Sequence, residues 1–170
     1  FVFLALAALY ESWGLPLAIL MSVPVAVLGA VLFIGVSHLL NAFYVNDIYM
    51  QISLVMLIGL AAKNAILVVE YADRLFNEQG ASLMDAAIGA AKLRVRPIIM
   101  TAFAFILGVM PLIFASGVYA TARNIMGVAL VGGMLFATLL GIFVYPALYY
   151  FVGRIGGFER RRERKKQEQS

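Results

Sequence analysis

The chain lacks cysteine entirely, and only 13% of its 170 residues are charged. Without cysteine, neither a disulfide nor a thiolate metal site can form. The single histidine, His38, has no second ligand candidate nearby, so no metal site is expected around it and none is expected elsewhere. So few charges, with 64% hydrophobic residues and a mean hydropathy of +0.95, exclude an ordinary soluble globular domain.

Basic residues are scarce outside the C-terminal end of the chain. Seven of the thirteen lysines and arginines lie between Arg154 and Lys166. No basic patch with interleaved aromatic residues occurs elsewhere, so nucleic acid is not an expected partner. The segment 154–170 is charged and has no apolar face, which predicts a basic, disordered tail.

Long apolar runs are what the chain has in abundance. About 20 apolar residues in a helix cross the hydrocarbon core of a bilayer, whereas barrel strands are shorter and alternate polar with apolar residues. The runs predict an all-α, polytopic transmembrane helix bundle with a partial first helix and four full spans. The expected boundaries are 1–10 for the partial helix and 15–36, 48–72, 97–115 and 125–152 for the spans. Because the chain begins inside an apolar run, we interpret residues 1–153 as part of a longer protein.

Residues 80–93 differ from the spans. Apolar and polar residues recur there at helical spacing, which predicts a short amphipathic helix on the membrane surface. Ser82 and Asp85 are typical of a helix start, with a hydroxyl cap and an acid in the first turn. The last span is rich in glycine and alanine, which favours close packing inside a bundle.

Loop charges predict the orientation. Arg74, Lys92, Arg94, Arg96 and the basic tail fall on one side of the membrane, and only Arg123 falls on the other. The positive-inside rule therefore places the C-terminus in the cytoplasm.

Lys63 lies deep inside the span 48–72. A charged side chain there costs about 2.5 to 3.5 kcal/mol on insertion scales, and such residues usually face a protein interior and serve a function. The alternative is a structural lysine that snorkels or pairs with Glu70, seven residues later on the same face. Asp47 lies in a loop and Glu70 near a helix end, so no carboxylate occupies the middle of a span.

Four motifs resemble, in order, the C-terminal part of resistance-nodulation-cell division efflux pumps, hydrophobe/amphiphile branch. They are Tyr10-Glu11-Ser12-Trp13, the run from Gly59 to Glu70, the run from Arg94 to Thr101, and the run from Phe105 to Leu112. The resemblance implies twelve transmembrane helices, a homotrimer in the bacterial inner membrane, and exchange of protons for drugs. It also implies a periplasmic adaptor protein and an outer-membrane channel as partners, both contacted through regions absent here.

The resemblance also implies a proton relay, whose residues fall on Lys63, Arg94 and Thr101, with Asn64 adjoining the lysine. The family's proton-accepting aspartates lie on a helix that would precede this segment. Arg94 and Thr101 are seven residues apart, so a continuous helix puts them on one face, Thr101 about 10 Å deeper. From position alone, Arg94 and Arg96 are also explained as positive-inside anchors, and Thr101 as a packing hydroxyl.

We therefore expect a part of a proton-driven multidrug antiporter, not an enzyme, with membrane lipid and copies of itself as partners and no cofactor. One alternative is a proton-coupled protein-export helper of the same superfamily. Another is a structural membrane module that transports nothing. Substitution of Lys63 separates the relay from the structural module.

Overall fold

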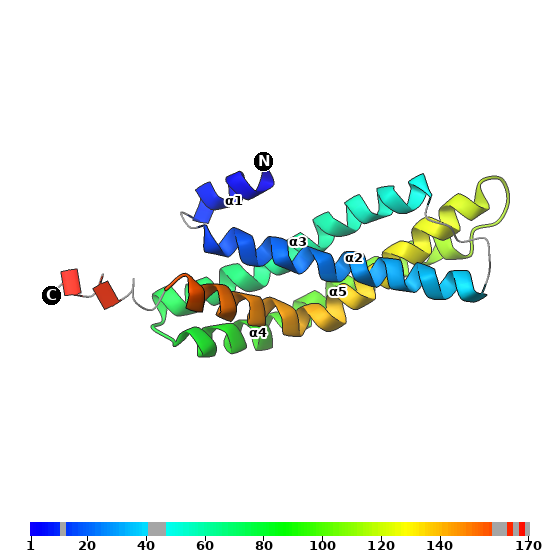
Figure 1. The fold of residues 1–170 in the computed structure, drawn as a ribbon. Helices are drawn as coiled ribbons and strands as arrows, with labels where there is room; N and C mark the ends of the chain where they lie inside the picture. Colours follow the sequence, from blue (N-terminus) through cyan, green and yellow to red (C-terminus); the bar gives the residue numbers. More distant parts are fainter. Residues whose placement is uncertain (11–12, 41–46, 158–162, 165–166, 169–170) are drawn as a thin grey trace. The chain divides into compact units, whose positions relative to one another are not determined.

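The computed structural model arranges the described residues in five helices (Figure 1). The residues that it describes are 1–10, 13–40, 47–157, 163–164 and 167–168. The helices are α1 (Val2–Tyr10), α2 (Gly14–Leu40), α3 (Ile48–Glu78), α4 (Leu83–Ile113) and α5 (Ala120–Ile155). Helices α2 to α5 are long and apolar enough to cross a membrane, and no strand occurs over the described ranges. The all-α, polytopic prediction is confirmed.

Helix α4 differs from the prediction. Residues 80–93 were expected to form a separate surface helix before a span at 97–115, but Leu83–Ile113 is one helix of 31 residues with Pro97 inside it. A proline within a helix removes one backbone hydrogen bond, whereas ending the helix there would leave several carbonyl and amide groups without partners. In an apolar environment, several backbone groups without partners cost more than one missing hydrogen bond, so the helix continues through Pro97.

Other helix ends also extend beyond the predicted spans. Helix α2 continues to Leu40, α3 to Glu78, and α5 runs from Ala120 to Ile155, so the end of α5 includes the first residues of the predicted tail. The predicted spans leave connections at 11–14 and 37–47, of which residues 11–12 and 41–46 lie outside the described residues, as does most of the predicted disordered tail.

The connection between α3 and α4 is a tight, capped turn. Gly80 has φ 73°, a conformation that glycine adopts at little cost, and the Ala81 amide donates to the Leu75 carbonyl at 3.4 Å. The Asp85 amide donates to Ser82 Oγ at 3.2 Å, and Ser82 Oγ donates to Asp85 Oδ2 at 2.8 Å. The predicted helix start at Ser82 is confirmed.

The connection between α4 and α5 is held by a side chain of the first turn of α5. Arg123 Nη2 donates to the Val118 carbonyl at 3.0 Å and to the Ser116 carbonyl at 3.4 Å. Gly117 and Tyr119 both have positive φ, at 96° and 63°. These two hydrogen bonds hold a turn that includes a tyrosine in a conformation rare for residues other than glycine.

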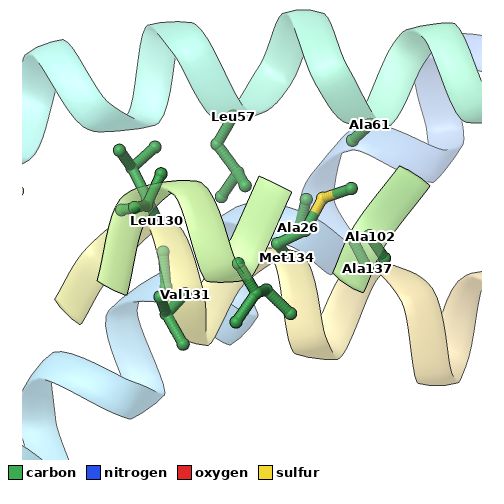
Figure 2. Packing of buried hydrophobic residues seen from close by; sticks show 11 residues of the cluster. Ala26, Leu57, Ala61, Ala102, Leu130, Val131, Met134 and Ala137 are labelled. Carbon is green, nitrogen blue, oxygen red and sulfur yellow. The ribbon is translucent and has the colours of Figure 1, made fainter. Parts of the chain in front are cut away.

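The chain divides into two compact units. The first unit consists of Phe1–Ser22, Asn64–Val95 and Ile142–Ser170, and the second of Val23–Lys63 and Arg96–Gly141. The core of the second unit is apolar and rich in alanine, and Figure 2 shows its side chains converging from α2, α3, α4 and α5. Its buried members include Ala26, Leu57, Ala61, Ala102, Leu130, Val131, Met134 and Ala137.

Glycines of α5 allow the close approach of helices within the second unit. A Cβ atom added at Gly132 would overlap Phe33 of α2, and one added at Gly133 would overlap Leu57 of α3. The most apolar part of α5 is 61% buried, against 17% for α4. The prediction that α5 packs inside the bundle is confirmed.

We expect Gly132→Ala to lower the free energy of unfolding by about 1 to 3 kcal/mol, because the new methyl group meets the Cβ of Phe33, which cannot move without its backbone. Thermal unfolding of the detergent-purified protein measures the change. Gly35→Ala is the control, since nothing lies within 4 Å of a Cβ there. Equal melting temperatures for the two variants would contradict the packing of α5 on α2.

Candidate functional site

Lys63 lies at the midpoint of α3, fifteen residues from each end. Its side chain is exposed, on a face that also carries Met56 and Gly59. No hydrogen bond or ion pair of Lys63 is recorded with any described residue. Glu70, the partner considered from the sequence, instead accepts a hydrogen bond from Arg74 at 2.9 Å. The structure therefore shows Glu70 engaged with Arg74, and the alternative of a structural lysine that snorkels or pairs with Glu70 stays a prediction.

The next residue, Asn64, lies on the buried side of α3, whereas Lys63 lies on the exposed side. One step along a helix turns by about 100°, so Asn64 joins the buried face of α3 with Ala61, Ala65 and Val68. Asn64 is only 4% exposed, and its Nδ2 has no hydrogen-bond partner among the described residues. An amide that is buried without a hydrogen-bond partner lowers the free energy of unfolding by about 1 to 3 kcal/mol. Asn64 is therefore a polar residue that destabilises the fold.

Thr101 lies on an exposed face of α4 together with Ala104 and Gly108. Its Oγ1 donates to the Ile98 carbonyl within the same helix at 2.9 Å. This bond uses the hydroxyl hydrogen and leaves the oxygen able to accept a hydrogen bond from another group. Because the side chain is exposed, the hydroxyl does not pack between described helices.

Arg94 is half-buried in the first half of α4, and its guanidinium carbon lies 4.8 Å from the centre of the Tyr71 ring of α3. Its Nε is buried and has no hydrogen-bond partner among the described residues. Arg96, two residues later, is exposed. Sequence reasoning did not identify Tyr71, because nothing in the motif containing Lys63 indicates which residue of α3 faces α4.

The four predicted relay residues are divided between the two units. Lys63 and Thr101 belong to the second unit, and Asn64 and Arg94 to the first. Arg94 and Thr101 share one helix because α4 continues through Pro97. Over the described ranges, no hydrogen bond or ion pair joins any two of the four. Nor does any group of three or more His, Asp or Glu residues in those ranges lie close enough together to hold a metal ion.

Four apolar spans, with Lys63 and Thr101 on exposed faces of α3 and α4, define a multi-pass helical membrane protein. Residues 1–153 match the AcrB/AcrD/AcrF family, and the chain belongs to this family. The resemblance to efflux pumps seen in the motifs is confirmed.

Curated relatives of this chain are efflux transporters. The chain is 50% identical over 157 residues to the toluene efflux pump membrane transporter TtgB of Pseudomonas putida, and the match covers 92% of this chain. It is 46% identical over 151 residues, 89% of its length, to the multidrug resistance protein MdtF of Escherichia coli. In both cases the match spans 14% of the relative.

We expect Thr101→Val to change the free energy of unfolding by no more than about 0.5 kcal/mol, because the side chain is exposed and its hydrogen bond stays within one turn of α4. The two side chains are similar in shape. Thermal unfolding in detergent, compared with wild type, measures the effect. A fall of several degrees would mean that the hydroxyl stabilises the fold, and any effect of this variant on transport would then be indirect.

Proposed function

We propose that this chain is part of an inner-membrane proton/drug antiporter that exports hydrophobic or amphiphilic compounds, and that it supplies part of the proton relay. The observation that carries the proposal is Lys63, an exposed lysine at the midpoint of an apolar helix. The relatives are named as toluene, solvent and multidrug efflux proteins, which supports this class of cargo.

The position of Lys63 requires a polar partner. In the predicted span 48–72, the nearer end is nine residues from Lys63, about 14 Å along the helix axis at about 1.5 Å per residue. Half of the hydrocarbon core is about 15 Å, and a lysine side chain shortens that distance only in part. A carboxylate from another part of the longer protein satisfies the ammonium group. Gly59 lies one turn before Lys63 on the same face of α3. Nothing lies within 4 Å of a Cβ atom added at Gly59, which leaves room for a further helix.

Such a pair couples proton binding to conformation. A neighbouring ammonium favours the ionised form of a carboxylate, so the pair is intact while the acid is ionised. When the acid takes up a proton, the attraction falls and Lys63 is released. A helix arrangement that depends on this pair then shifts between two states, which transport requires. Arg94 and Thr101 border the path by which protons reach the acid, and Asn64 supports the helix beside Lys63.

Further properties of the whole protein belong to this proposal. On the family pattern the complete protein is a homotrimer that works with a periplasmic adaptor protein and an outer-membrane channel. The present chain would contribute membrane helices only, and the contacts with these partners would come from other regions.

We expect Lys63→Met in the complete transporter to reduce proton-coupled drug efflux to background, because methionine fills similar space without a charge to pair. Efflux is measured in cells at matched amounts of protein in the membrane. Lys92→Met is the control, because Lys92 is also exposed but lies in the third turn of α4. Efflux of Lys63→Met equal to that of wild type would support the structural module and refute the relay.

We also propose that the C-terminus lies in the cytoplasm, as the excess of lysine and arginine on that side predicts. We expect a green fluorescent protein fused after Ser170 to fluoresce and an alkaline phosphatase fused there to be inactive. The same reporters inserted after Gly117, in the connection between α4 and α5, should give the reverse result. Active phosphatase at the C-terminus would overturn the orientation.

A further inference from the structure

The contact between Arg94 and Tyr71 lies within the first unit, where the ends of α3 and α4 pack together. The capped turn at Ser82 joins the two helices, and a Cβ atom added at Gly89 would lie 3.2 Å from Leu75 Cδ1. Leu75 is one turn after Tyr71 on α3, and Gly89 precedes Arg94 by five residues on α4. The short turn and the close packing fix the two helices beside each other, so the ring and the guanidinium meet in a defined geometry.

Three acids of this region are engaged with other groups, and a fourth, Glu78 at the end of α3, is exposed. Glu70 accepts a hydrogen bond from Arg74, Asp73 is hydrogen-bonded to Asn77, and Asp85 accepts one from Ser82. No carboxylate of the described residues forms an ion pair with Arg94. The distance of 4.8 Å from Cζ to the ring centre is within the range of a cation–π contact. The ring face of Tyr71 is therefore the contact in the structure that orients the guanidinium of Arg94.

A ring face and a carboxylate hold an arginine in different ways. A carboxylate neutralises the charge and occupies the N–H donors at the edge of the guanidinium. An aromatic ring contacts the flat face and leaves the edge donors able to bind water or an incoming acid. Held by the ring, Arg94 thus keeps its charge and its donors other than the buried Nε, which suits a group that orders water on a proton path.

We propose that Tyr71 is a positioning residue for Arg94: its ring face fixes the guanidinium in the orientation that the proton relay uses. This inference rests on the proposed function of Arg94. The ring, and not the phenolic hydroxyl, performs this role, so phenylalanine should replace tyrosine and an aliphatic residue should not.

The experiment measures initial rates of proton-coupled drug efflux in the complete transporter, per amount of protein in the membrane. We expect Tyr71→Leu to lower the rate roughly threefold to thirtyfold, the range that corresponds to one partly buried cation–π contact, and Tyr71→Phe to keep most of it. Tyr150→Leu is the matched control, because Tyr150 is another half-buried tyrosine of the first unit. If Tyr71→Leu reduces the amount of protein, Tyr71→Met replaces it as the non-aromatic variant.

Two further variants, Arg94→Gln and Arg94→Gln combined with Tyr71→Leu, distinguish the proposed relay role of Arg94 from the positioning role of Tyr71. Residues that act as a unit are not additive, so the double variant should be no slower than Arg94→Gln alone. Wild-type efflux in Arg94→Gln would refute the proposed role of Arg94 itself. Loss of efflux in Arg94→Gln with full activity in Tyr71→Leu, or equal loss in Tyr71→Phe and Tyr71→Leu, would overturn the positioning role of Tyr71.

Discussion

The ammonium group of Lys63 sets the main physical constraint on this chain, because a charge inside a hydrocarbon layer is costly unless a polar group accompanies it. Helix α3 meets two demands at once. Its buried face, with Ala61, Ala65 and Val68, packs in the described structure, while Lys63 lies on the other face. The charge therefore lies outside the apolar core, on a face that the described helices leave exposed.

The core of the second unit contains no charged residue among its buried members. Its helices approach closely at Gly132 and Gly133, and close-packed interiors resist continuous deformation. A change of pairing at Lys63 can therefore alter how the exposed face of α3 meets its neighbour without breaking this core. The arrangement keeps the part that would respond to protons separate from the part that maintains the fold.

The spans were predictable because length and hydropathy alone determine them, and the cap at Ser82 because its signal is local. The continuity of α4 was not predictable, since the sequence does not show whether Pro97 ends a helix or lies inside one. The relay motif indicated Lys63, with Asn64 adjoining it, yet their side chains lie on different faces. Which residue faces another helix depends on the rotation of both, and for this reason Tyr71 was missed.

Arg94 connects these observations. The exposed ion pair of Arg74 with Glu70 contributes little to stability, about 0.3 to 0.5 kcal/mol for such a helix pair, but it engages an acid of α3 one residue before Tyr71. Arg94 is left with the ring, a contact that restrains it without neutralising it. The hairpin of α3 and α4 determines this contact, so a change in the packing of the two helices would change the direction of the guanidinium. Under the proposed function, helix packing and the electrostatics of the proton path would thereby be coupled through a single aromatic side chain.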